Sequence, residues 1–265
     1  MTNLLKRGIS GLIYTVLFIG AIIYSKESYL GLIIMFGFVC IWEFFKIVKY
    51  KNILIYILFL VLIYLQYPNF KSSLISHILL ILCLSGSIQL LINLFIKKKT
   101  YPSNTIQKLD ISIRYLLLSF VFLILLPFVN GEYKESIILS LVFFIWVNDS
   151  FAFFVGKNFG KKKLFESISP KKTIEGFLGG VIFTIITAFM LSHFENFLSL
   201  TQLIVVSLIA SIFGSMGDLV ESKFKRQAKI KDSGNIMPGH CGLLDRLDSL
   251  LFVSPFVYLY INYLI

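Results

Sequence analysis

Charged side chains are scarce in this sequence, and their scarcity excludes an ordinary soluble domain. Of the 265 residues, 15% are charged and 57% are hydrophobic, and the mean hydropathy is +0.84. Soluble globular domains carry roughly 25% charged residues. The composition therefore indicates an integral membrane protein.

Cysteine and acidic residues are also few. With three cysteines and no CxxC spacing, the sequence predicts neither a disulfide framework nor a zinc site. The 14 Asp and Glu residues leave a net charge of +11, which in a soluble protein would suggest nucleic acid. In a membrane protein, the positive-inside rule and anionic headgroups explain the same excess. We therefore expect the lipid bilayer as a partner and no nucleic acid.

Apolar stretches of near-spanning length are separated by short polar breaks, and they predict an all-α polytopic membrane fold. No small-residue cleavage pattern follows the basic N-terminus, so the first stretch is interpreted as a permanent span. The nine expected transmembrane helices cover residues 9–24, 29–45, 53–66, 74–96, 113–129, 136–155, 174–192, 202–218 and 247–264.

Lysine and arginine are distributed unequally between the two sides of these spans. With a cytoplasmic N-terminus, the successive inner segments hold 2, 3, 5, 6 and 6 of them, and only Lys26, Lys71 and Lys134 remain outside. This asymmetry of 22 to 3 predicts a cytoplasmic N-terminus and a C-terminus outside. We expect a multi-pass protein of the cell inner membrane.

The two halves of the chain differ in where their charges lie. The spans before about residue 135 are plain Leu, Ile and Phe, whereas charges and glycines extend into the span ends of residues 136–265. We interpret 1–135 as a transmembrane scaffold and 136–265 as the catalytic region of one integrated membrane domain. No internal repeat is visible.

Three polar constellations in the second half all fall on the expected cytoplasmic side. The first is Asn148-Asp149-Ser150, near the inner end of the sixth span. An Asp at the centre of a membrane helix costs about 2.5–3.5 kcal/mol on insertion scales, and less near an end. We therefore expect Asp149 to be functional or else paired with a neighbouring lysine.

The second constellation is Ser169-Pro170-Lys171-Lys172-Thr173, ahead of the seventh span. Ser-Pro is typical of a helix N-cap followed by the first helical position. Lys171 and Lys172 would then surround a helix N-terminus, whose free N–H groups attract anions. The alternative is a lysine pair that only sets the topology of a capped helix.

The third constellation runs from Gly217 to Asp248. Helical spacing places Asp245 and Asp248 on one face of a helix. Each piece has a simpler explanation as a solvated face, a structural histidine or topogenic lysines. A topogenic loop, however, needs no carboxylates. An earlier set of polar residues in this segment also shares one helical face: Asp218, Glu221, Ser222, Lys225 and Lys229.

These residue types suit phosphoryl or nucleotidyl transfer. Carboxylates from two helices can hold Mg²⁺ against phosphate oxygens, while Lys, Arg and glycine turns bind the phosphates themselves. His240 is the single histidine of the third constellation, so no general base is obvious. That fits a nucleophile that is already anionic, such as a phosphate monoester, with catalysis by positioning and electrostatics.

The segment 222–248 closely resembles the signature of the phosphatidate cytidylyltransferases, also called CDP-diacylglycerol synthases. The likeness is strong over about residues 145–250, while the N-terminal spans match only in hydropathy. Cys241 stands where the family usually has Gly, and Met237 where it usually has Leu, Ile or Phe. The matching positions are Ser222, Phe224, Lys225, Arg226, Lys231, Asp232, Gly234, Pro238, His240, Gly242, Asp245, Arg246, Leu247 and Asp248.

The resemblance implies that CTP and phosphatidate form CDP-diacylglycerol and pyrophosphate with Mg²⁺, by attack of a lipid phosphate oxygen on the α-phosphate of CTP. It implies Asp218 and Asp245 as metal ligands, with Asp248 supporting them. A second cation such as K⁺ and a homodimer are implied by the family alone. The residues implied to bind the substrates are Ser222, Lys225, Arg226, Lys231 and Arg246, the anion site of Ser169, Lys171 and Lys172, and also Asp149, Asp232 and His240.

Two other functions remain open. A related membrane enzyme, such as a polyprenol kinase or a CDP-archaeol-type synthase, would use CTP on another lipid, and a panel of lipid acceptors distinguishes it. A secondary transporter for an anionic solute would use the membrane charges as a path. Transporters commonly carry inverted repeats with sites at the midplane, whereas this chain shows no repeat and its charges lie at one face.

Overall fold

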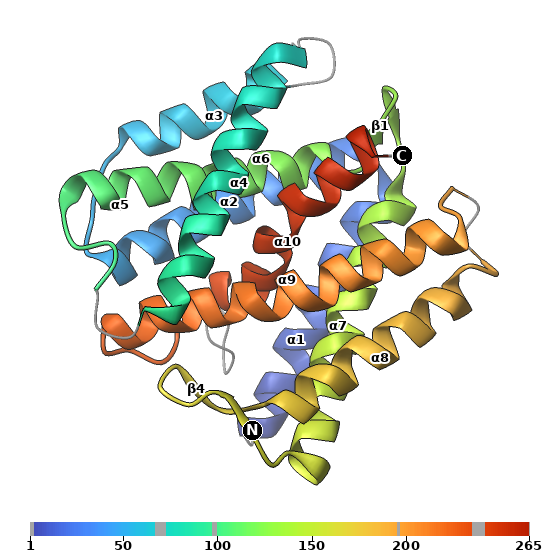
Figure 1. The fold of residues 1–265 in the computed structure, drawn as a ribbon. Coiled ribbons are helices and arrows are strands. Elements are labelled where there is room, and N and C mark those ends of the chain that lie inside the picture. The colour runs from blue at the N-terminus through green and yellow to red at the C-terminus, as the bar shows by residue number, and fades with distance from the viewer. Residues whose placement is uncertain (1–2, 67–72, 97–99, 195–196, 235–241, 265) are drawn as a thin grey trace.

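The computed structural model describes residues 3–66, 73–96, 100–194, 197–234 and 242–264, and most of them are helical (Figure 1). This confirms the prediction of a mostly helical membrane fold. The helices are α1 (Asn3–Tyr24), α2 (Lys26–Val48), α3 (Leu54–Gln66), α4 (Ser73–Phe95), α5 (Thr105–Ile111), the π-helical turn η1 (Ser112–Leu117), α6 (Leu118–Leu125), α7 (Glu135–Phe159), α8 (Ile174–Leu191), α9 (Leu200–Gln227) and α10 (Leu244–Tyr263).

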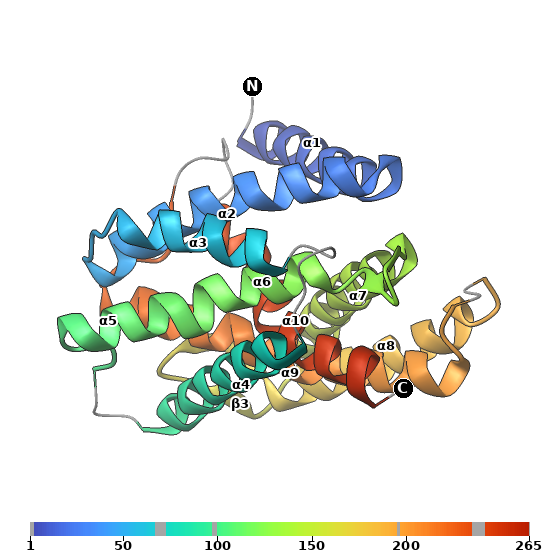
Figure 2. The same ribbon diagram turned by 90° about the horizontal axis from the view of Figure 1, so that it is seen from above.

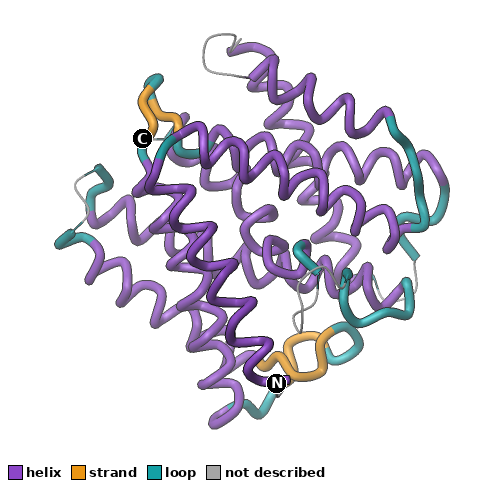
Figure 3. Tube along the Cα trace, turned by 180° about the vertical axis from the view of Figure 1, so that it is seen from behind, coloured by secondary structure: helices purple, strands orange, loops and turns teal. Residues whose placement is uncertain are grey.

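Short antiparallel hairpins interrupt the helices, and the expectation of an all-α chain missed them. Strand β1 (Phe128–Val129) pairs with β2 (Glu132–Tyr133), and β3 (Lys163–Phe165) pairs with β4 (Ser169–Thr173). Asn130-Gly131, both with positive φ, close the first hairpin. Figure 3 shows the hairpins at opposite ends of the molecule.

Five described helices are long and apolar enough to cross a membrane, namely α2, α4, α7, α8 and α9. Helices α1 and α3 contain shorter apolar stretches. The described residues therefore support a multi-pass membrane protein. Some expected boundaries are wrong: the helix expected over 113–129 begins at Thr105, where Asn104 caps it, and ends at Leu125 before β1.

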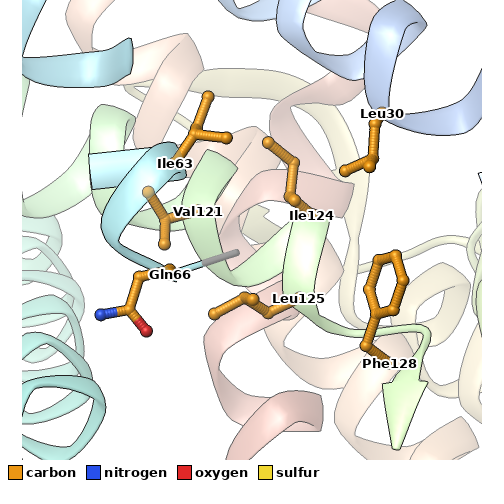
Figure 4. A pocket seen from close by; sticks show the side chains of 7 residues that line it. All are labelled: Leu30, Ile63, Gln66, Val121, Ile124, Leu125 and Phe128. Atoms are coloured by element: carbon orange, nitrogen blue, oxygen red, sulfur yellow. The ribbon is translucent and has the colours of Figure 1, made fainter. Parts of the chain in front are cut away.

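Helix α6 forms the centre of the apolar core. All of its residues are buried, and it packs against α2 and α3 on one side and α4 and α10 on the other (Figure 2). A small apolar pocket remains between α2, α3 and α6 (Figure 4), and none of the described residues that line it is ionisable. Its lining residues are Leu30, Ile63, Gln66, Val121, Ile124, Leu125 and Phe128.

Glycines bring α7 and α8 close together. A Cβ added to Gly179 would lie 2.6 Å from the Val155 side chain, and one added to Gly180 would lie 2.5 Å from Asn148 Oδ1. Small residues matter at such contacts because lipid supplies no hydrophobic force between helices. Helix α9 packs against both α7 and α8 and also against α10. The polar ends of the second half are thereby gathered around α9.

Candidate active site

The C-terminal turns of α9 meet the β3–β4 hairpin at an ion pair. Asp218 Oδ2 lies 2.5 Å from Lys172 Nζ of β4, and Asp218 Oδ1 accepts a hydrogen bond from Ser222 Oγ at 3.2 Å. The side chains of Lys172 and Asp218 are 29% and 33% exposed. This pair is therefore open to a ligand that arrives from outside the protein.

Lys225 lies two turns further along α9 and is buried. Its Nζ donates to Asp245 Oδ1 of α10 and lies 3.4 Å from Glu221 Oε2. Asp245 Oδ2 accepts from both Ser233 N and Ser233 Oγ at 2.9 Å, and from Gly242 N at 2.8 Å. A carboxylate with so many donors is fixed in one orientation. Asp245 thus fastens the start of α10 to α9.

Glu221 and Asp248 are the most buried acids of this cluster. Glu221 is fully buried, and neither of its carboxylate oxygens has a hydrogen-bond partner among the described residues. Asp248 is 8% exposed and interacts electrostatically with Glu221 and Asp218. Buried carboxylates are unfavourable unless positive charge compensates them. Lys225 supplies one such charge, since its Nζ lies 3.4 Å from Glu221 Oε2 and also donates to Asp245.

The start of α8 differs from its prediction. The expected cap at Ser169-Pro170 is wrong, because Ser169–Thr173 forms strand β4. Thr173 is the N-cap instead, and its Oγ1 accepts from Gly176 N at 3.1 Å. Proline fits both settings, since its fixed φ suits an edge strand as well as a first helical turn. Lys172 therefore reaches Asp218 from a strand and not from a helix N-terminus.

Asn148 and Asp149 lie on α7 beside α9. Asn148 Nδ2 donates to Ser215 Oγ of α9 at 3.2 Å, and Asn148 is buried. Asp149 is exposed and within electrostatic reach of Lys172 and Asp218. The structure thus brings the first two predicted constellations to the same side of α9.

The remaining predicted residues lie toward solvent or outside the described part of the chain. Arg226 is exposed, and its guanidinium donates to the Ile168 and Ile230 carbonyls at 3.2 and 3.3 Å. Lys229 lies beyond the end of α9 with φ 58°, so its predicted place on the helical face is wrong. Ser169 is half-buried. The exposed ones are Lys171, Lys231, Asp232 and Arg246, and the undescribed ones are Met237, Pro238, His240 and Cys241.

The predicted metal ligands lie on neighbouring helices. Asp218 belongs to α9, Asp245 and Asp248 belong to α10, and the two helices pack against each other. Within the described ranges, no three His, Cys, Asp or Glu side chains are arranged so as to hold a metal ion. Lysines pair with Asp218 and Asp245 instead.

Glu43 of α2 is a site residue that the sequence reasoning missed. It is fully buried, and it accepts hydrogen bonds from Leu243 N and Leu244 N at the start of α10. A signal was present, because Glu43 is the single charged residue of the expected span 29–45. Ionisable residues inside a membrane segment are a functional signal by default.

Comparison with known proteins identifies the family of this chain. The sequence model of the Cytidylyltransferase family matches residues 5–264. The chain belongs to the cytidylyltransferase family. The resemblance inferred from the signature is confirmed, and the match also takes in the N-terminal helices, where only hydropathy had suggested it.

Individual relatives agree with the family match. Phosphatidate cytidylyltransferase of Bacillus subtilis (strain 168) is 33% identical over an alignment 265 residues long, which covers 97% of each chain. The enzyme of that name from Staphylococcus haemolyticus (strain JCSC1435) is 51% identical over 112 residues. The one from Staphylococcus aureus (strain COL) is 49% identical over 119 residues. The two staphylococcal matches cover less than half of either chain.

Proposed function

We propose that this cytidylyltransferase joins CTP and phosphatidate into CDP-diacylglycerol and pyrophosphate. The observation that carries the proposal is the signature of residues 222–248, folded so that α9 and α10 share the Lys225–Asp245 pair. A relative of matching length carries the name phosphatidate cytidylyltransferase. The enzyme is therefore a nucleotidyltransferase of phospholipid biosynthesis.

The reaction needs charge compensation more than proton transfer. An oxygen of the lipid phosphate attacks the α-phosphorus of CTP, the bond to the oxygen that bridges the α- and β-phosphates breaks, and pyrophosphate leaves with that electron pair. The attacking phosphate is already anionic, so no side chain has to remove a proton. Lys172 and Lys225 supply positive charge on the same side of α9, and exposed Arg226 adds to it. Catalysis then rests on positioning and electrostatics.

The donor chemistry of the cluster fits Mg²⁺, because this ion prefers carboxylate oxygens. Three carboxylates lie near the single buried lysine among the described residues of this cluster: Asp245 and Glu221 flank Lys225, and Asp248 interacts electrostatically with Glu221 and Asp218. We propose that Asp218, Asp245 and Asp248 hold the ion. Bound Mg²⁺ would offset the negative charge of the triphosphate. A second cation such as K⁺ stays a prediction.

We also propose the finer topology. The enzyme has nine spans in the cell inner membrane, with the N-terminus and the active site on the cytoplasmic side and the C-terminus outside. Residues 1–135 serve as the scaffold and 136–265 as the catalytic region. The lysine and arginine asymmetry of 22 to 3 supports this orientation, and soluble CTP would reach the site from the cytoplasm. A homodimer is proposed from the family resemblance alone.

Single cysteines in the two hairpins test the orientation. In a background without the native cysteines, Glu132→Cys should react with a membrane-impermeant maleimide in intact cells. Lys163→Cys should react only after the membrane has been opened, because β3 lies at the opposite end from β2 (Figure 3). The reverse labelling pattern would contradict the proposed orientation.

The position of the label in CTP tests the reaction itself. Purified protein in detergent receives Mg²⁺ and CTP labelled at either the α- or the γ-phosphate, with phosphatidate, a polyprenol or an archaeol-type ether lipid as acceptor. Transfer of the α-label to phosphatidate, with one pyrophosphate released for each product, is the expected result. Transfer of the γ-label to the polyprenol would identify a kinase, and reaction of the ether lipid alone would identify the related synthase.

A further inference from the structure

Glu43 is an anomaly in the apolar half of the molecule. It lies in α2, within an expected span that has no other charged residue, and its side chain is fully buried. An ionised carboxylate in such a place is costly unless donors surround it. The physical question is therefore which groups compensate this charge.

The donors come from the start of α10. Glu43 Oε2 accepts from Leu244 N at 2.8 Å, and Glu43 Oε1 accepts from Leu243 N at 3.2 Å. Leu243 is the N-cap of α10 and offers no side-chain hydrogen bond to the helix. The first N–H groups of a helix need external acceptors, and the helix dipole favours a negative charge there. Glu43 thus caps α10 from a different helix.

Glycines of the signature leave room for this carboxylate. A Cβ on Gly242 would lie 2.6 Å from both Glu43 oxygens, and a Cβ on Gly234 would lie 2.9 Å from Glu43 Cδ. Neither distance is compatible with a side chain larger than that of glycine unless Glu43 moves. At Gly242 the Ser233 hydroxyl lies closer still, so glycine there follows from close approach to both Ser233 and Glu43, whereas at Gly234 it follows from close approach to Glu43.

The same backbone segment holds Asp245. Gly242 N donates to Asp245, while Leu243 N, the next amide, donates to Glu43. Ser233 Oγ lies 2.9 Å from Asp245 Oδ2 and 3.2 Å from Glu43 Oε2. The single hydroxyl hydrogen of Ser233 serves one carboxylate at a time. The two carboxylates share the Ser233 hydroxyl and are held by consecutive backbone amides, so a displacement of Glu43 should change the position of Asp245.

We propose that Glu43 is a positioning residue for cytidylyl transfer, because it anchors the start of α10 and thereby orients Asp245 toward the substrates. The inference rests on the proposed function, in which Asp245 acts at the substrate phosphates. It assigns the apolar half a direct part in building the active site.

The substitution Glu43→Gln tests the proposal with little change in volume. Glutamine keeps one acceptor oxygen and turns an NH₂ group toward the α10 amides, which are donors themselves. Glu27→Gln is the matched control, since Glu27 lies on the same helix and its side chain is 68% exposed. Two quantities are measured on full-length protein in detergent: hydrogen exchange of the Leu243 and Leu244 amides, and turnover per folded molecule.

In Glu43→Gln, these amides should exchange at least about tenfold faster, while the amides at the start of α8 stay as in the wild type. Turnover should fall by about ten- to a hundredfold, the usual cost of losing a residue that orients a ligating side chain. The Mg²⁺ concentration for half-maximal turnover should rise, which a mere loss of folded protein would not produce. Glu27→Gln should match the wild type in all three measurements.

Wild-type turnover, or unchanged exchange at Leu243 and Leu244, in folded Glu43→Gln would overturn the proposal. If that variant does not fold, Gly234→Ala takes its place, because the added methyl group displaces the Glu43 carboxylate without removing it. Wild-type turnover, or unchanged exchange at Leu243 and Leu244, in Gly234→Ala would then overturn the proposal. A wild type that forms no CDP-diacylglycerol would refute the proposed function, and the exchange measurement would still show whether Glu43 holds α10.

Discussion

The two halves of the chain treat buried carboxylates differently. In the first half, the buried Glu43 carboxylate accepts hydrogen bonds from the Leu243 and Leu244 amides at 3.2 and 2.8 Å. In the second half, acids and lysines gather around α9, and the buried Glu221 carboxylate is left without a hydrogen-bond donor among the described residues. The first arrangement stabilises a fold, whereas the second is suited to receiving a charged ligand.

The presence of ion pairs does not by itself distinguish the two halves, because the first half contains one too. Arg114 of η1 binds both carboxylate oxygens of Asp110 at 2.7 Å and also donates to Ser85 Oγ at 3.1 Å. This cluster is satisfied by its own members, which is typical of a structural ion pair. The contrast therefore lies in incomplete compensation around α9, and the following substitutions test it.

Lys225→Met should have the largest effect. Lys225 is buried between Glu221 and Asp245, and removing one partner of a buried ion pair costs about 3–5 kcal/mol. The thermal midpoint should fall strongly and CDP-diacylglycerol formation should be lost. Lys223→Met is the control on the same helix: Lys223 donates to the Asn93 and Ile96 carbonyls near the end of α4. Equal losses of turnover in both variants would show that Lys225 matters no more for catalysis than Lys223.

Lys172→Met should lower kcat/KM with little change in stability. Its ion pair with Asp218 is about one-third exposed, and a charge-assisted hydrogen bond to a substrate phosphate is worth about 1.5–3 kcal/mol. That corresponds to a loss of roughly ten- to a hundredfold. Lys163→Met on the paired strand β3 is the matched control, since Lys163 is exposed. Equal activity of the two variants would argue against a phosphate contact at Lys172.

Gly180→Ala and Gly31→Ala should change stability in opposite directions. At Gly180 the new methyl group would meet Asn148 Oδ1, and overpacking of this kind costs about 1–3 kcal/mol. At Gly31 in α2 a Cβ has nothing within 4 Å, so alanine should stabilise the helix by about 0.5–1 kcal/mol. Thermal unfolding in one detergent compares them. Equal shifts would contradict the close α7–α8 packing.

Tyr29→Phe should have the smallest effect. It removes one buried hydrogen bond, to the Leu123 carbonyl, at a net cost of about 1 kcal/mol. The thermal midpoint should fall slightly and turnover per folded molecule should not change. A loss of turnover that exceeds the loss of stability would show that a residue of the first half other than Glu43 also affects catalysis.

The sequence predicted the helices well because long apolar runs leave few alternatives in a membrane. It also placed Lys225 and Asp245 in one functional cluster, although their direct contact spans 20 positions and follows no periodic pattern. Strand β4 was missed because Ser-Pro suits an edge strand as well as a helix start. Glu43 stood out as the single charged residue of its expected span, but its role could not be inferred from the sequence, because its partners include backbone amides 200 and 201 positions away, which carry no residue-specific signal.

The most direct test of the central claim compares the wild type with Asp245→Asn in an assay of CTP, phosphatidate and Mg²⁺. The wild type should form CDP-diacylglycerol and pyrophosphate in equal amounts. The variant should turn over at about a hundredth of that rate or less, as expected when a preorganised charged group at the reacting phosphates is removed. A wild type that forms no product, or an Asp245→Asn variant that matches it, would contradict the account.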